Sequence, residues 1–323
     1  MSCILILCYI VKVQNPIVLK TQIPNAPIAL FVYRRTSLVR KVIEALVLNK
    51  EALNSNLTIF SDGAKGNGDE SDVIAMRKYL STITGFNSVT VITRDKNLGL
   101  AQSFIQGISE MLRANNCAIF VEEDNLVSSV FLSYMNSALR VYEYERKVIC
   151  ITGYSFPIKK VGKKGYFMKG AQTWTMGTWA PKWQLFNSDS VELMKQVNSK
   201  NLKQQLNLYG TNYYSMLSRQ IEGKIDSWGV RWMVSAICEN MYCFYPPIAF
   251  CRNIGNTLYA THARSDDLLL LNNQKLATKV NFELPSFHKK FIIKPIYLKL
   301  MWKYLSMKRR IILFFNVRSN HDV

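Results

Sequence analysis

The 323-residue sequence predicts an α/β protein with a mostly parallel central sheet flanked by helices. Strand-like and helix-like segments alternate from Pro27 onward, which is the pattern of βαβ units. Hydrophobic residues make up 49% of the chain, enough for one large domain or a domain with a substantial addition. Four of the expected strands end in polar residues, so we expect ligands beyond the carboxyl ends of the sheet.

Each element of the first half follows from its local pattern. Apolar runs predict strands over residues 28–33, 57–60, 88–93, 117–121 and 148–152. Helical periodicity predicts helices over 37–49, 72–83, 100–115 and 130–144. Thr36 or Ser37 is expected to cap the first helix, and a polar loop with glycines follows Ser61-Asp62-Gly63.

Beyond Gly153 the order of elements changes. A basic loop from Lys159 to Gly165 leads into a tryptophan-rich segment, and helices are then expected over 191–198, 213–223 and 230–240. We predict a boundary after residue 153, a mainly helical part over 154–284, and a separate tail over 285–323. Residues 1–24 form an N-terminal extension.

The cysteines and the first residues bear on the compartment. Seven cysteines form no CxxC pair, which indicates neither a zinc site nor a disulfide framework and favours a reducing, cytoplasmic setting. The apolar run from Cys3 to Val13 is too short to span a bilayer. It is expected to be an added strand, a poorly ordered extension or a weak interfacial anchor.

Three consecutive carboxylates, Glu122-Glu123-Asp124, follow the fourth strand. At the end of a buried strand they repel one another, and a divalent cation would relieve the repulsion. Mg²⁺ or Mn²⁺ held by such carboxylates and by substrate phosphates would neutralise a departing diphosphate. The alternative is an acidic loop that complements the dipole of the next helix.

Polar residues after the other strands point to the same edge. Asp62 follows the second strand, and the Arg94-Asp95-Lys96-Asn97-Leu98-Gly99 loop joins the third strand to a helix. Backbone N–H groups at that helix start, with Arg94 and Lys96 near them, would suit a phosphate or a ribose. Asp95 or Asn97 as a plain helix cap is the competing interpretation. Arg34 and Arg35 close the first strand, where one of them would meet a nucleotide phosphate.

Several segments in this order resemble GT-A glycosyltransferases, which have a Rossmann-like fold. In the nucleotide-binding half they are Phe31-Val32-Tyr33-Arg34-Arg35, Ile59-Phe60-Ser61-Asp62-Gly63, Arg94 to Ala101 and Val121-Glu122-Glu123-Asp124. Thr173 to Trp183, Asp226 to Trp232 and Arg252-Asn253-Ile254-Gly255 continue the resemblance in the second half. The likeness is to bacterial family 2 type enzymes of surface-polysaccharide synthesis and to the N-acetylglucosaminyltransferase I type.

The resemblance implies a nucleotide-sugar-binding part over 25–153 and an acceptor-binding, catalytic part over 154–284. It implies that Asp62 contacts the uracil or ribose, Arg35 the nucleotide, Glu123 the ribose and Asp124 the metal. Here Glu123 stands in the middle of a motif that the family usually writes D-x-D or E-D-D. The complete set expected at the donor is Arg35, Asp62, Arg94, Asn97, Gly99, Glu123 and Trp179.

A single displacement with inversion needs a base for the acceptor hydroxyl. We choose Asp226, beside Trp228 and Trp232, with Asp189 as a weaker candidate. The alternative is that Asp226 caps the following helix.

The sequence leaves two alternatives open for the tryptophans and two for His262. Trp174, Trp179 and Trp183 are expected either in the pocket or in the core. His262 is expected either at the metal and diphosphate site or on the surface.

The tail is a distinct basic segment. Lys289 to Val323 holds nine Lys and Arg against one acid, whereas residues 25 to 288 hold 30 basic and 21 acidic residues. From Phe287 to Phe315 the charges interleave with apolar residues, as in segments that lie on anionic membranes. No nucleic-acid motif accompanies the charge, so we expect no nucleic-acid partner. A helix packed on the domain is the alternative.

These observations predict a metal-dependent hexosyl- or N-acetylhexosaminyltransferase, inverting and peripheral at the inner face of a bacterial membrane. Its donor would be a nucleotide-sugar, most simply a UDP-sugar, and its acceptor a lipid-linked glycan of O-antigen or capsule synthesis. Two alternatives are an inert carbohydrate-binding or scaffold protein on the same fold and a sugar nucleotidylyltransferase. The latter usually opens with a glycine-rich loop, and residues 28 to 40 contain no glycine.

Overall fold

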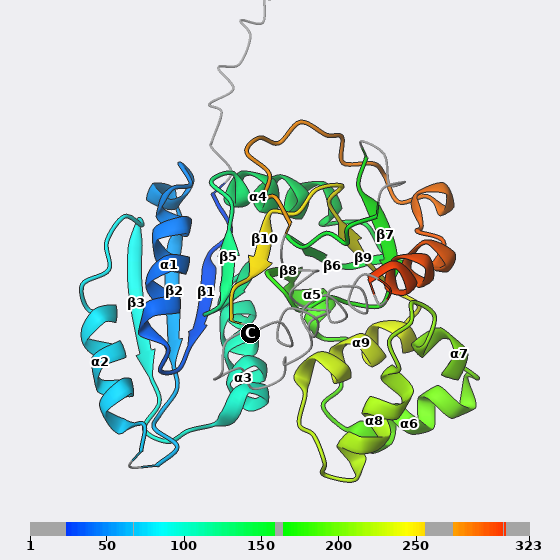
Figure 1. Cartoon of the computed structure of the whole chain (residues 1–323), viewed down its shortest axis with the longest axis horizontal. Coiled ribbons are helices and arrows are strands. Elements are labelled where there is room, and N and C mark those ends of the chain that lie inside the picture. The colour runs from blue at the N-terminus through cyan, green and yellow to red at the C-terminus, as the bar shows by residue number, and fades with distance from the viewer. Residues whose placement is uncertain (1–23, 67, 159–163, 256–273, 306, 308–323) are drawn as a thin grey trace, which may run out of the picture.

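An eight-stranded sheet lies at the centre of the protein (Figure 1), with the order β3-β2-β1-β4-β8-β6-β9-β7. The computed structural model describes residues 24–66, 68–158, 164–255, 274–305 and 307. The strands are β1 (Ile28–Val32), β2 (Asn56–Ser61), β3 (Ser88–Thr93), β4 (Cys117–Glu122), β6 (Val148–Thr152), β7 (Tyr166–Lys169), β8 (Met176–Trp179) and β9 (Tyr242–Tyr245).

The sheet is mixed but mostly parallel. Strands β3, β2, β1 and β4 pair in parallel, as do β6 and β9. Strand β8 is antiparallel to β4 and β6, and β7 is antiparallel to β9. The predicted α/β fold with a mostly parallel sheet is therefore confirmed.

Helices cover both faces of the sheet, as parallel strands require. All five residues of β1 are buried, so this strand needs apolar cover on each side. Helices α1 (Thr36–Val47), α2 (Glu70–Leu80) and α4 (Phe131–Tyr142) lie on one face (Figure 1). Helices α3 (Gly99–Ala114), α5 (Ala180–Trp183) and α9 (Trp228–Cys238) pack together on the other.

Helices α6 (Ser190–Ser199), α7 (Lys203–Leu206) and α8 (Tyr213–Ile221) form a second apolar cluster with α9. The predicted helices of the second half are present, but the same half also supplies β7, β8 and β9 to the main sheet. The sheet thus runs across the predicted boundary at residue 153. These strands have four residues each, too short for a clear alternating pattern.

A small second sheet lies at the edge of the strand ends. It pairs β5 (Asn125–Val127) with β10 (Cys251–Asn253) in antiparallel register, with Asn253 opposite Asn125. The short 3₁₀ helices are η1 (Ala52–Asn54) and η2 (Lys289–Phe291). The second sheet brings β10, from the second half of the chain, directly beside the acidic triplet.

The beginning of the basic tail packs on the domain. The Tyr142 hydroxyl donates to the carbonyl oxygen of Pro285 at 2.8 Å, and the Phe287 ring contacts Phe167 and Tyr242. Residues 295–305 form a helix. Within the described residues, no helix combines the length and the apolar character needed to cross a membrane. The apolar run from Cys3 to Val13 lies outside the described residues.

A glycine in α3 permits the close packing of this helix on β1. A Cβ added to Gly107 would lie 2.4 Å from the Phe31 ring, which is stacked between Phe60 and Phe104. We expect Gly107→Ala to lower the free energy of unfolding by about 1–3 kcal/mol through overpacking, although alanine favours helices. Denaturant unfolding would measure this. Gly66→Ala, with nothing within 4 Å of its added Cβ, is the control and should change stability little.

Candidate active site

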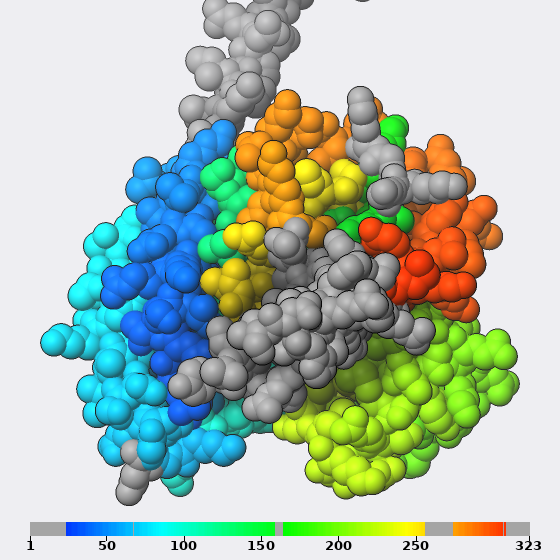
Figure 2. Space-filling view, in the orientation of Figure 1, coloured from blue at the N-terminus to red at the C-terminus, as the bar shows by residue number. Residues whose placement is uncertain are grey.

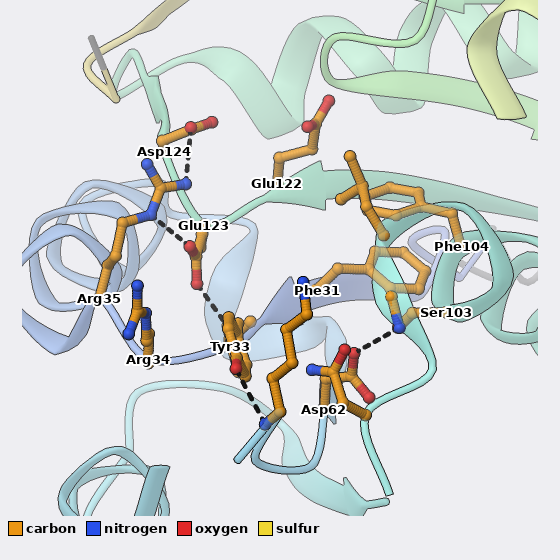
Figure 3. A pocket seen from close by; sticks show the side chains of 15 residues that line it. Phe31, Tyr33, Arg34, Arg35, Asp62, Ser103, Phe104, Glu122, Glu123 and Asp124 are labelled. Carbon is orange, nitrogen blue, oxygen red and sulfur yellow. Dashed lines mark hydrogen bonds and ion pairs between the residues drawn. The ribbon is translucent and has the colours of Figure 1, made fainter. Parts of the chain in front are cut away.

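A cavity opens at the carboxyl ends of β1, β2 and β4, beside the start of α3 (Figure 3). It gathers six of the residues predicted for the donor and metal sites. They are Arg35, Asp62, Asn97, Gly99, Glu123 and Asp124. In an open α/β sheet this edge is where ligands bind, so the cavity is the candidate active site.

Arg35 joins two members of the acidic triplet. Its Nε donates to Glu123 Oε1 at 2.5 Å, and its Nη2 donates to Asp124 Oδ2 at 2.8 Å (Figure 3). Arg35 reaches both carboxylates from the N-cap position of α1. The prediction that Thr36 or Ser37 caps this helix is therefore wrong, and the cap residue makes no side-chain hydrogen bond.

Glu123 is held from two sides. Its second oxygen, Oε2, accepts from the Tyr33 backbone N–H at 2.7 Å, and its side chain is buried. Burial raises the pKa of Glu123, and the neighbouring Arg35 charge and hydrogen bond oppose that rise. The carboxylate is therefore held in place in the wall of the cavity. Each of its oxygens accepts one of these hydrogen bonds and keeps the capacity to accept another from a ligand.

Glu122 points to the opposite side of the chain from Glu123 (Figure 3), as successive residues at a strand end do. Its carboxyl lines the cavity. Burial, followed by the negative charge of Asp124, raises the pKa of Glu122 to about 8. Near neutral pH this group is thus mostly a neutral acid in the metal-free protein.

Asp62 caps the start of α3 from a neighbouring loop. Its Oδ1 accepts from the Leu98 N–H at 2.9 Å and its Oδ2 from the Gly99 N–H at 3.1 Å. The Leu98 and Gly99 backbone N–H groups, at the helix start predicted to face a phosphate or a ribose, are therefore occupied by Asp62. Asn97 instead donates to the Gly63 carbonyl at 2.8 Å, and neither Asp95 nor Asn97 is the N-cap residue, which is Leu98.

The second half of the chain reaches Asp124 through β10. Asn253 Nδ2 donates to Asp124 Oδ1 at 2.9 Å, and the Ile254 N–H donates to the Asp124 carbonyl at 2.7 Å. A Cβ on Gly255 would lie only 2.1 Å from the Asp124 carboxylate. Only a residue without a side chain fits there, so the carboxylate is clamped between Arg35 and this turn.

Asp226 lies near the cavity but does not line it. Its carboxylate is 69% exposed and accepts from Arg231 Nη2 at 2.7 Å. Two residues later, the Trp228 ring stacks on Phe104, a lining residue, with ring centroids 5.0 Å apart. Ser227, and not Asp226, caps α9 by accepting from the Val230 N–H. Asp226 is thus free of the capping role that was its alternative.

Other predicted site residues point elsewhere. Arg94 pairs with Glu110 at 2.7 Å, and the buried Trp179 donates from its indole N–H to the Leu139 carbonyl at 3.2 Å. Neither lines the cavity. Asp189 caps α6. His262 falls outside the described residues.

The remaining tryptophans belong to packed aromatic clusters. Trp183 is buried and stacks on Phe186, and its indole N–H donates to Ser109 Oγ at 3.0 Å. Trp174 is partly buried and meets the Tyr154 ring edge-on. The surroundings of these tryptophans therefore fit a place in the core better than a place in the pocket.

Sequence reasoning gave no role to the residues that shape the loop side of the cavity. The Tyr33 hydroxyl donates to Asp69, and Asp69 also accepts from the backbone N–H groups of Lys65 and Gly66 at 3.2 Å. Tyr33 and Lys65 both line the cavity. The polar loop after β2 was visible in the sequence, but its attachment to Tyr33 depends on a contact between residues 36 positions apart.

The Asp124 carboxylate is a ligand of the kind that a hard divalent cation prefers. Asp124 offers carboxylate oxygens at the cavity, where Arg35 holds one oxygen and Asn253 the other. Among the described residues, no group of three or more His, Cys, Asp or Glu side chains is arranged to hold a metal. An ion at Asp124 would therefore take further ligands from substrate phosphates and water, as Mg²⁺ commonly does.

Comparisons with known proteins found no matching family model and no matching curated protein. Among solved structures, the chain is similar to the mannosyltransferase PcManGT from Pyrobaculum calidifontis in complex with GDP-Man and Mn²⁺, at 11% identity and a TM-score of 0.34. That match covers 54% of this chain and 46% of the other.

Two further matches are similarly distant. S. aureus TarS matches at 10% identity and a TM-score of 0.38, over 69% of this chain and 36% of the other. Glucosyl-3-phosphoglycerate synthase from Mycobacterium tuberculosis, in complex with Mn²⁺, UDP and glucosyl-3-phosphoglycerate, matches at 12% and 0.27, over 40% and 43%. The chain thus spans less than half of each of these proteins. At TM-scores below 0.5, no residue role is transferred from them.

The raised pKa of Glu122 predicts a pH-dependent effect on stability. Because the folded protein holds this proton up to about pH 8 and the unfolded chain releases it near 4.5, its contribution is full below 4.5 and falls as pH rises to 8. The Glu122→Gln variant has no carboxyl group at this position, so its stability does not fall in this way as pH rises. Its free energy of unfolding, relative to the natural protein, should rise by roughly 2–4 kcal/mol between pH 5 and pH 8.

Denaturant unfolding at several pH values, with a chelator present, would measure that difference. Glu70→Gln, on α2 and away from the cavity, is the matched control. A difference that stays constant from pH 5 to pH 8 would show that Glu122 is ionised in the folded protein.

Proposed function

We propose that the protein is a glycosyltransferase that moves a sugar from a nucleotide-sugar donor to a lipid-linked glycan. One observation carries the proposal. The cavity at the strand ends joins Asp62, Arg35, Glu123 and Asp124, and the second half of the chain closes directly on Asp124 through Asn253. The proposed nucleotide site and the proposed acceptor-side half would thus share one carboxylate, that of Asp124.

The polar groups of the cavity suit the parts of a nucleotide-sugar, most simply a UDP-sugar. Asp62, in the wall beside α3, would accept from the uracil or ribose. Glu123, on the opposite wall, would accept from a ribose hydroxyl. Arg35 is the cation for the diphosphate, since a guanidinium binds phosphate oxygens as it binds carboxylates.

A bound Mn²⁺ or Mg²⁺ would offset the charge that develops on the departing nucleoside diphosphate. Asp124 is the residue that would hold it, because its carboxylate faces the cavity and is oriented from two sides by Arg35 and Asn253. Arg35 would then exchange part of its contact with Asp124 for the donor phosphates. Glu123 and Asn253 would keep the carboxylates in place during that exchange.

The acceptor would enter on the side of α9. In an inverting displacement the acceptor hydroxyl oxygen bonds to the anomeric carbon, the bond from that carbon to the diphosphate oxygen breaks, and the hydroxyl proton passes to a base. Asp226 is our candidate for that base, because it is exposed and Trp228 next to it packs on the cavity wall. Arg231 would orient its carboxylate.

The basic tail and the bacterial resemblance support an acceptor at the inner face of the cell membrane. We propose a lipid-linked oligosaccharide of O-antigen or capsule synthesis, with the enzyme bound peripherally. A lipid-linked acceptor keeps its glycan close to the bilayer, so a transferase held at the same surface meets it at a higher effective concentration.

Removing the proposed metal ligand tests the activity itself. With a panel of UDP- and GDP-sugars, we expect slow Mn²⁺-dependent donor hydrolysis by the natural protein and a loss of at least about 100-fold in Asp124→Asn. Asp72→Asn, an exposed acid on α2, is the control and should keep the activity. Tight glycan binding indifferent to Mn²⁺ and donor would instead support the inert scaffold.

Replacing the proposed base separates chemistry from donor binding. Asp226→Asn should lower sugar transfer to an acceptor by about 10²–10⁴-fold, because no group takes the hydroxyl proton, while donor binding stays unchanged. Transfer assays and calorimetric donor titration would measure the two effects. Asp189→Asn, which preserves a capping side chain, should retain transfer. Normal transfer by Asp226→Asn would remove Asp226 from the mechanism.

A further inference from the structure

The helix over residues 295–305 has one face fixed against the domain. Leu298, Met301 and Leu305 are buried. The Trp302 indole N–H donates to the Tyr209 carbonyl at 3.0 Å, and the Trp302 ring lies against Gly210. These contacts hold the helix in one rotational setting, so the side chains on its other face point outward in a defined direction.

That outward face is apolar. Ile296, Leu300, Tyr304 and Met307 are 52%, 55%, 58% and 51% exposed. At 3.6 residues per turn these four positions lie within about a quarter of a turn of one another. We name this set the exposed stripe. A helix that buries apolar residues on one face and exposes others on a second face presents an apolar surface that a partner could cover.

The charged residues of the segment that carries the exposed stripe are all positive. Five exposed lysines lie on this segment, and residues 285–307 contain no aspartate or glutamate. They are Lys289, Lys290, Lys294, Lys299 and Lys303. Figure 2 shows the segment, coloured orange to red, at the surface on the right of the molecule.

Exposed apolar side chains beside lysines fit one kind of partner better than others. A second copy of the chain would meet the lysines with its own lysines and be repelled. A nucleic acid would attract the lysines but leave the apolar side chains without a partner. An anionic bilayer satisfies both, because acyl chains accept the apolar residues and lipid headgroups attract the cations.

We infer that the exposed stripe, with Lys299 and Lys303 along its edge, is the surface through which the folded domain docks onto an anionic membrane. It deepens the membrane location given in the proposed function by naming the contact surface. This arrangement differs from a tail detached from the domain. The inner face of the helix stays packed on the domain, and only its outer face enters the membrane interface.

Vesicle binding by the full chain tests this surface without any donor. The natural protein should bind vesicles of phosphatidylcholine with phosphatidylglycerol and bind pure phosphatidylcholine much less. The double variant Ile296→Ser with Leu300→Ser should weaken binding to the anionic vesicles about tenfold or more, since two apolar anchors are lost. Lys299→Glu with Lys303→Glu should weaken it comparably and reduce its salt dependence.

The matched control is Leu53→Ser with Ile74→Ser, which removes two equally apolar side chains that are 67% and 61% exposed elsewhere on the domain. It should bind as the natural protein does, and thermal unfolding should show that all variants are folded. Stripe variants that bind as tightly as the natural protein would overturn the inference. So would binding that depends on charge alone, as for nucleic acid or an acidic protein. Donor hydrolysis is measured separately, so either proposal can fail without the other.

Discussion

The structure depends on one electrostatic constraint, which is the confinement of three consecutive carboxylates at the end of a buried strand. Arg35 offsets two of them, and burial suppresses the charge of the third, Glu122. Losing one partner of such a partly buried pair leaves an uncompensated charge, at a cost of about 3–5 kcal/mol in buried cases. The arrangement is therefore tolerated in the free protein, and a divalent cation at the proposed metal site would further reduce the repulsion.

The same constraint explains how the two halves of the chain are joined. Asp124 is contacted by Arg35 from the end of β1 and by Asn253 from β10, although Asn253 lies 129 residues further along the chain. Gly255 allows the backbone of the turn to approach the carboxylate. On the other side of the cavity, Trp228 on α9 stacks against Phe104 on α3. A change at either contact would move residues of the second half of the chain relative to the cavity at the strand ends.

Much of the fold follows from local sequence patterns, and the site does so in part. Strands β3 and β6 were predicted to the residue, because their apolar runs are bounded by turn residues on both sides. The short strands β7, β8 and β9 were missed, since each is stabilised by its neighbours in the sheet more than by its own pattern. Asp62 and Asp124 were expected at this edge because they lie just beyond the ends of strands, and both line the cavity. The clamp from Asn253 was not, because it requires the pairing of β5 with β10.

Asp62 lines the cavity at the predicted edge of the sheet, but the local arrangement around it differs from the predicted one. The start of a helix has N–H groups without partners inside the helix, and the sequence suggested a phosphate or a ribose at the start of α3. In the folded chain the anion is the Asp62 carboxylate itself, bonded to the N–H groups of Leu98 and Gly99. A second negative group at that position would be repelled. The donor diphosphate would therefore lie toward Arg35 and Asp124, and the base or ribose toward Asp62, which sets the direction of the nucleotide across the strand ends.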